Sequence, residues 1–177
     1  MPLSASEQIR LEFLRDLAEP EQEARLAQIA ALAFDEQQLP FVGPPPEQIQ
    51  AFREQPARDT FAIIAGTAQG EQVIGVGSLH LEGTDGLWPP GTLLYRGLVI
   101  DPAWQGRGVG SRTTELVLAA AAERYPQQES LVLAVHVDNP AGKRAYEKNG
   151  FIVDEGTLFR TEKGDHHVMR APIASCR

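Results

Sequence analysis

Three glycines and an arginine lie within five residues at the junction between an apolar, strand-like run and a helix-like run. The junction covers residues 105–111, and the strand-like run covers residues 93–100. Glycine lets the backbone approach a ligand closely and turn its N–H groups toward one point, where a helix N-terminus adds partial positive charge. The junction therefore predicts a binding site for the phosphate groups of a cofactor.

Hydrophobic periodicity along the chain predicts the elements that must position this junction. Strands are expected at residues 9–14, 60–65, 73–81, 93–100, 131–137, 151–160 and 165–170. Helices are expected at residues 19–34, 46–54 and 109–125, and from Pro140 to a stop at Asn149 and Gly150. Because strand, glycine loop, helix and strand follow one another, one right-handed crossover should join two parallel strands. We expect a single α/β domain over residues 1–177, with helices flanking a mostly antiparallel mixed (α+β) sheet of about seven strands.

Three glycine-rich phosphate motifs compete for residues 105–111. The nucleoside triphosphate loop needs a lysine after its last glycine, but Ser111 follows Gly110 directly. The dinucleotide fingerprint needs a third glycine where Arg112 stands, and further parallel strand–helix units that the chain lacks. The remaining pattern, Gln-x-x-Gly-x-Gly, is met by residues 105–110. Only this third motif agrees with the sequence.

A second motif follows about 30 residues later, at residues 139–151. It has Asn139, Tyr146 with Glu147 and Lys148 after it, and Gly150 before an aromatic residue. The two motifs, in this order and separated by one predicted helix and one predicted strand, closely resemble those of the GNAT N-acetyltransferase superfamily. The resemblance extends over essentially the whole chain and implies the GNAT-like acyl-CoA N-acyltransferase fold.

The resemblance implies a role for each residue of the two motifs. Backbone N–H groups of the loop would receive the pyrophosphate of coenzyme A, and Arg107 would add a charge-assisted contact; the loop residues are Gln105, Gly106, Arg107, Gly108, Val109, Gly110 and Ser111. Backbone groups of Leu98, Val99 and Ile100 would bind the pantetheine arm, and the Val99 N–H would polarise the thioester carbonyl. Asn139 would cap its helix and bind pantetheine, and Tyr146 would protonate the departing thiolate.

The general base is not identified by the motifs. The acceptor amine is an ammonium ion at neutral pH and must lose a proton before it attacks. Many family members supply a glutamate from the strand that enters the glycine loop, but that position falls at Leu94. The alternatives that stay open are a water chain and the side chains of Asp35, Glu36, His80, Glu82 and His136.

The composition of the chain indicates which kinds of binding partner and cellular location to expect. The net charge of −8 disfavours nonspecific nucleic-acid binding. No apolar run approaches the length of a membrane span, so a cytoplasmic protein is expected. The lone cysteine, Cys176, excludes an internal disulfide, and the adjacent pair His166 and His167 would point to opposite faces of a strand, so no metal site is expected. Acidic residues outside residues 105–150 favour a cationic acceptor.

Together these features predict an acyl-CoA-dependent N-acyltransferase, most simply an acetyltransferase. Acetyl-CoA would be the cosubstrate, and an amine of a small molecule or peptide would attack it directly in a ternary complex. The alternative is a sensor or interaction module that binds coenzyme A without catalysis. Dimerisation is common in the family, so the resemblance also allows a homodimer.

Overall fold

The computed structural model of the chain describes residues 8–81, 88 and 90–174. In these residues one seven-stranded sheet has the order β1-β2-β3-β4-β5-β7-β6, and only the β4–β5 pair is parallel. The strands are β1 (Gln8–Phe13), β2 (Arg58–Thr67), β3 (Gly70–Leu81), β4 (Thr92–Ile100), β5 (Ser130–His136), β6 (Ile152–Thr161) and β7 (Gly164–Pro172). The predicted mixed sheet with one parallel crossover is confirmed.

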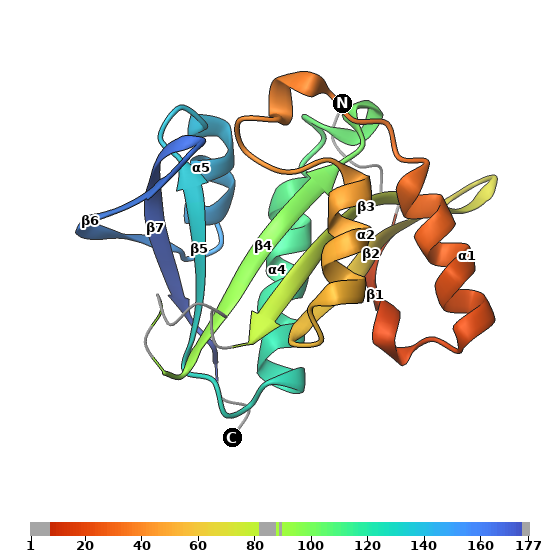
Figure 1. The fold of residues 1–177 in the computed structure, drawn as a ribbon, viewed down its shortest axis with the longest axis horizontal. Helices are drawn as coiled ribbons and strands as arrows, with labels where there is room; N and C mark the ends of the chain where they lie inside the picture. Colours follow the sequence, from red (N-terminus) through yellow and green to blue (C-terminus); the bar gives the residue numbers. More distant parts are fainter. Residues whose placement is uncertain (1–7, 82–87, 89, 175–177) are drawn as a thin grey trace.

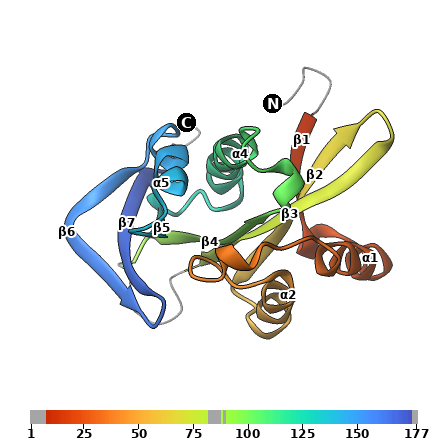
Figure 2. The same cartoon turned by 90° about the horizontal axis from the view of Figure 1, so that it is seen from above.

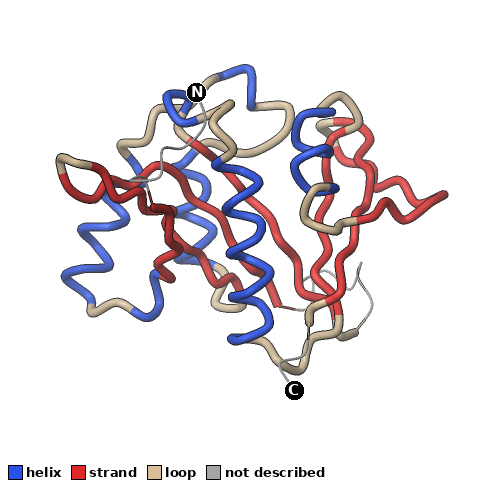
Figure 3. The backbone as a smooth tube through the Cα atoms, turned by 180° about the vertical axis from the view of Figure 1, so that it is seen from behind, coloured by secondary structure: helices blue, strands red, loops and turns tan. Residues whose placement is uncertain are grey.

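Helices cover both faces of this sheet (Figures 1 and 2). Helices α1 (Glu19–Ala30) and α2 (Pro45–Glu54) lie on one face, which we call the front. Helices α4 (Val109–Arg124) and α5 (Pro140–Glu147) lie on the back, nearest the viewer in Figure 3. None of the helices in the described residues is long and apolar enough to cross a membrane.

Each face has its own apolar core. Leu26 and Phe52 pack against the front of the sheet, and Val117 and Ala121 pack against the back. Burying one large aliphatic or aromatic side chain contributes roughly 1.5–3 kcal/mol. Two separate cores therefore hold the sheet in place and leave its central strands free to carry a site.

Helix α1 is shorter than its apolar pattern predicts. The chain leaves the helix after Ala30, where the Leu32 N–H turns back to the Ile29 carbonyl at 3.1 Å. Leu32 and Phe34 still pack against the front core, but from an irregular segment. The predicted helix to Phe34 is wrong at this end because apolar residues outside the helix reach the same core.

The sheet opens between β4 and β5. Their parallel pairing covers only residues 92–94 and 130–132, and β5 then continues on β7 alone. Near this point β4 carries an irregularity opposite β3, where Gly97 has a φ of +69°. Figure 1 shows the two strands diverging toward their C-terminal ends. The divergence exposes backbone groups of both strands in the middle of the sheet.

Candidate active site

The glycine-rich turn joins β4 to α4. Gly106 and Gly108 have φ values of +70° and +86°, in the left-handed region that residues with a Cβ avoid. Gly108 is the N-cap of α4 and makes no side-chain cap hydrogen bond, so the first N–H groups of the helix need another acceptor. This is the backbone arrangement that binds an anion.

A groove of about 470 Å³ lies between this turn and α5, and we call it the loop groove. Residues from the end of β4 and from both predicted motifs line it: Leu98, Ile100, Gln105, Gly106, Gly108, Val109, Gly110, Ser111, Asn139 and Tyr146. Arg144 and Lys148 of the α5 segment also line the groove and add positive charge. The sequence places these two in a locally basic segment that suits an anionic cofactor, but it does not assign them to the site, because a basic residue on a helix is usually only a solvated surface group.

Arg107 does not line the loop groove. Its guanidinium lies over the Trp104 ring, 4.5 Å from the ring centroid. A cation over an indole ring is attracted by the negative face of the ring, which holds this side chain along the turn. The direct phosphate contact that the motif predicts for Arg107 stays a prediction.

The backbone of Val99 faces β3 rather than the gap. The Asp101 N–H donates to the Ile74 carbonyl at 2.9 Å. Val99 lies two residues before Asp101 and pairs with Val76 in the same antiparallel ladder, so its backbone groups face β3 as well. Because backbone groups alternate between the two edges of a strand, those of Leu98 and Ile100 point toward the gap. The expected oxyanion role of Val99 is therefore corrected, and Leu98 is the residue whose N–H is suitably directed.

A small cavity of about 130 Å³ fills the gap between β4 and β5. It shares Leu98, Asn139 and Tyr146 with the loop groove. On the other side it shares Tyr95, Arg96 and Gly97 with a pocket of about 570 Å³, which we call the front pocket. The three cavities thus lie next to one another from the glycine turn to the front face and share parts of their walls.

Tyr146 lines both the loop groove and the gap. Its ring is held edge-on against Tyr95, with centroids 6.1 Å apart, and lies 5.9 Å from the Phe151 ring. Burial raises the pKa of the Tyr146 phenol to about 12. The phenol is therefore protonated at neutral pH and can donate a hydrogen bond or a proton.

Asn139 caps α5, as expected. Its Oδ1 accepts a hydrogen bond from the Gly142 N–H at 3.0 Å, and the side chain also lines the loop groove and the gap. The cap occupies the oxygen, so the amide nitrogen is the group left to donate to a ligand.

Two substitutions separate these roles of Asn139. Asn139→Ala should lower the free energy of unfolding by about 1 kcal/mol, because the cap is lost. Asn139→Asp keeps an equally good cap but removes the amide donor, so stability should stay close to wild type while coenzyme A affinity falls. Chemical denaturation and isothermal titration with coenzyme A measure the two effects. Equal affinity of Asn139→Asp and wild type would limit Asn139 to capping.

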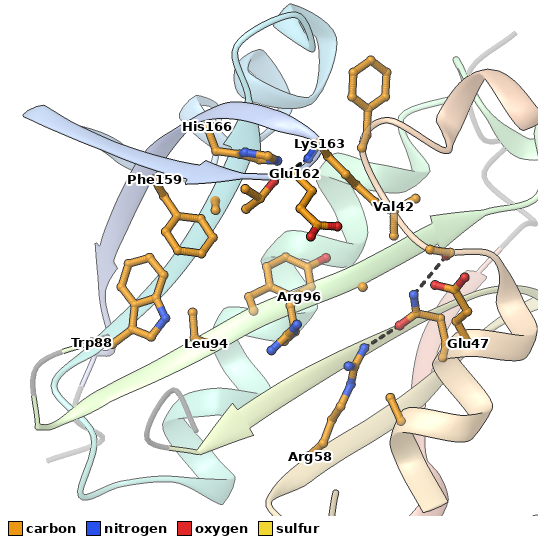
Figure 4. A pocket seen from close by; sticks show the side chains of 18 residues that line it. Val42, Glu47, Arg58, Trp88, Leu94, Arg96, Phe159, Glu162, Lys163 and His166 are labelled. Atoms are coloured by element: carbon orange, nitrogen blue, oxygen red, sulfur yellow. Dashed lines mark hydrogen bonds between the residues drawn. The ribbon is translucent and has the colours of Figure 1, made fainter. Parts of the chain in front are cut away.

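The front pocket combines charged and apolar walls (Figure 4). On one side Trp88 and Phe159 lie with ring centroids 5.7 Å apart, above Leu94. Besides Tyr95, the charged and titratable side chains that line the pocket are Glu47, Arg58, Arg96, Glu162, Lys163 and His166. The pocket can therefore hold a small molecule with both polar and apolar parts.

Most of the expected candidates for the base do not fit this geometry. Leu94 packs in an apolar cluster, which agrees with its inability to act. His136 is buried rather than a surface group; its Nδ1 accepts from the Asp138 N–H, and its Nε2 bonds the Lys163 carbonyl. His80 is fully buried beside Arg96. Asp35 caps a short 3-10 helix, and Glu82 lies outside the described residues.

His166 is a site residue that sequence reasoning did not assign to catalysis. It lines the front pocket, and its Nδ1 lies 3.0 Å from the Gly164 carbonyl oxygen. Since a carbonyl oxygen only accepts, this hydrogen bond requires a proton on Nδ1, and a ring that carries that proton alone keeps a lone pair on Nε2. In the described residues no group of three potential metal ligands comes together.

A glycine turn suited to an anion on the back, a cavity in the opened sheet and a pocket on the front give the site room for two ligands. The chain matches the sequence profile of the acetyltransferase (GNAT) family over residues 18–151. It belongs to that family and is an acetyltransferase.

Solved structures share its fold at low sequence identity. Aminoglycoside acetyltransferase AAC(6')-Ib in complex with coenzyme A is 16% identical, with a TM-score of 0.67 over 94% of this chain and 95% of that one. Spermidine N-acetyltransferase from Vibrio cholerae, in complex with CoA and spermine, is 18% identical, with a TM-score of 0.65 over 96% and 97%. No curated protein matches the chain.

Proposed function

We propose that the protein transfers an acetyl group from acetyl-CoA to the amine of a small molecule by direct attack in a ternary complex. The row of adjoining cavities from the loop groove through the gap to the front pocket, with Tyr146 lining the first two, supports this proposal. A donor in the groove and an acceptor in the pocket can meet in the gap. The front pocket, at about 570 Å³, has the volume of a small-molecule site. A cytoplasmic location and a homodimer stay expectations from the sequence.

The loop groove fits the phosphate end of coenzyme A. A Cβ at Gly106 or Gly108 would meet no protein atom within 4 Å, so the space beside both glycines is open to a ligand. The N–H groups at the start of α4, with Arg144 and Lys148, would hold the pyrophosphate. Backbone groups of Leu98 and Ile100 would bind the pantetheine amides as an added strand does. The cosubstrate supplies an acetyl group activated as a thioester.

The residues of the gap would assist the transfer itself. The amine nitrogen forms a bond to the acetyl carbon, the carbon–sulfur bond breaks, and sulfur leaves with the electron pair. The Leu98 N–H would donate to the carbonyl oxygen as its negative charge grows. The Tyr146 phenol would give its proton to the sulfur.

His166 is the residue we propose to take the proton from the acceptor ammonium. Its hydrogen bond to the Gly164 carbonyl uses Nδ1, so the Nε2 lone pair remains available to accept a proton. Imidazole is well matched to proton transfer near pH 7. Glu162 and Glu47 line the same pocket and are weaker bases. The proton would pass from the ammonium group to Nε2 either directly or through one bridging water.

Replacing His166 by glutamine should lower kcat/KM about 100-fold at pH 7, near the low end for acid–base catalysis, since water can still accept the proton. The loss should shrink as the pH approaches the pKa of the acceptor ammonium, because the amine then arrives deprotonated. Rates from pH 6 to pH 10 measure this. The control is His167→Gln, whose side chain lies on the opposite face of β7. A loss that does not change with pH would argue against the base role.

Thiol release from acetyl-CoA with a mixed panel of primary amines tests the proposed function. Turnover together with an acetylated amine, identified by mass spectrometry, is the expected result. Coenzyme A should also raise the melting temperature of the protein. Tight binding of acetyl-CoA without turnover on any amine would instead support the non-catalytic coenzyme A module.

A further inference from the structure

We propose that the acceptor is an α-amino acid with an apolar side chain, whose carboxylate binds between Arg58 and Arg96. This rests on the proposed function and names the substrate class of the same site. Two guanidinium groups, an apolar wall and a glycine bulge in the front pocket carry the inference.

Arg58 is a buried cation that faces only neutral partners in the described residues. Its side chain lies in the front pocket, yet the residue is 5% exposed. Its Nε donates to the Ser78 hydroxyl at 3.1 Å, and its Nη2 donates to the Gln48 side-chain oxygen. Burying a charge is costly without a counter-charge, and these two acceptors carry none. An anionic ligand would supply what is missing.

Asp59, the acidic residue next to Arg58 in the chain, does not act as the counter-charge of Arg58. Asp59 points to the other face of β2, where its Oδ2 accepts from Arg124 at 3.0 Å and from the Tyr125 hydroxyl at 2.8 Å. The charge that does act on Arg58 is that of Arg96. Burial and this neighbouring cation lower the pKa of Arg58 to about 10. Two guanidinium groups close enough to repel make a site for a carboxylate.

The place of Arg58 sets how far the carboxylate lies from the reacting amine. A Cβ at Gly97 would lie 2.6 Å from Arg58 Nη2, so the guanidinium is packed against the bulge of β4. Gly97 lines both the front pocket and the gap, one residue before the Leu98 N–H. A carboxylate bound there lies beside the point where the amine attacks. The two groups must therefore be joined by a short link, as they are on the α-carbon of an amino acid.

The opposite wall suits an apolar side chain. Trp88, Leu94 and Phe159 form an apolar surface in the same pocket, across from the guanidinium groups (Figure 4). Contact with this wall would bury the side chain while the carboxylate is held at the bulge. A polyamine or an aminoglycoside would instead bring further positive charge toward Arg58 and Arg96. Glu47 and Glu162 also line the pocket, but the end formed by the two guanidinium groups disfavours the cationic acceptor that the overall acidity of the chain suggested.

Matched substrates test the inference directly. L-Phenylalanine and L-phenylalaninol share the amine and the side chain, and only the first carries a carboxylate. We expect kcat/KM at least 10-fold higher for phenylalanine, since a hydrogen bond to a charged group is worth roughly 10- to 100-fold. Spermine, added as a third substrate, should be poorer still. Equal or better turnover of phenylalaninol or spermine would overturn the inference and leave the proposed function standing.

Variants connect the preference to the arginines. Arg96→Gln should lower the ratio of kcat/KM for phenylalanine over phenylalaninol about 10- to 100-fold, and Arg58→Lys should lower it less, since a charge is kept. Arg53→Gln, which breaks an exposed pair with Glu23, is the control and should not change the ratio. An unchanged ratio in Arg96→Gln, with the coenzyme A-induced rise in melting temperature intact, would overturn the inference. No turnover on any amine would overturn the proposed function as well.

Discussion

Replacing Tyr146 by phenylalanine should lower kcat on the order of 100- to 1,000-fold, with little change in coenzyme A affinity. The substitution removes one oxygen from a ring held between Tyr95 and Phe151, so packing and fold should persist. What is lost is the donor beside the gap that the departing sulfur needs. Steady-state kinetics and coenzyme A titration of both proteins give the two quantities.

The pKa of Tyr146 makes this prediction sharper. Because burial raises that pKa to about 12, the phenol is protonated at every pH from 6 to 9 in which an assay is practical. The ratio of wild-type to Tyr146→Phe kcat should therefore be constant over that range. A ratio that falls as the pH rises from 6 to 9 would mean that the Tyr146 phenol loses its proton within this range, which would contradict its raised pKa.

Tyr125→Phe is the matched control. The Tyr125 hydroxyl donates to Asp59 at 2.8 Å and lines none of the three cavities of the site. Its loss should lower the free energy of unfolding by about 1–2 kcal/mol and leave kcat near that of wild type. If Tyr146→Phe behaves in the same way, Tyr146 has only a packing role.

The back of the site could be predicted from the sequence because it is encoded locally. A left-handed glycine, a helix N-terminus and a capping asparagine are properties of a few neighbouring residues, so Gly106, Gly108 and Asn139 lie where their motifs predict. The family pattern also gave the position of Tyr146 beside the gap. The sequence does not show which residues of β4 direct their backbone N–H groups toward the gap, since the bulge at Gly97 decides this. That bulge explains why the N–H proposed to donate to the thioester carbonyl is that of Leu98 and not that of Val99.

The front of the site depends on contacts between distant segments. Arg58 comes from β2, Arg96 from β4 and His166 from β7, and no local spacing connects them. In the sequence, the front pocket is marked by a missing group, because Leu94 stands at the position where the family resemblance leads one to expect a glutamate. The structure gives that residue a positive role, as part of the apolar wall with Trp88 and Phe159.

Gly97→Ala should lower the free energy of unfolding by about 2–4 kcal/mol, through two costs. A residue with a Cβ at a φ of +69° is strained by roughly 1–2 kcal/mol. The new Cβ would also collide with Gln48 and with Arg58 Nη2, which are tied to each other by a hydrogen bond and cannot both withdraw freely. Thermal unfolding should show a melting temperature lower by about 5–15 °C.

A control at Gly156 separates the two costs. Gly156 has a φ of +80°, and a Cβ there would meet nothing within 4 Å, so Gly156→Ala carries the strain without the collision. The difference between the two variants measures how tightly the Arg58 guanidinium is packed against the bulge. A displaced guanidinium should also lower kcat/KM for phenylalanine more than for phenylalaninol. Equal destabilisation by the two substitutions would show that Arg58 does not lie against β4, and would remove the geometric reason for a carboxylate close to the reacting amine.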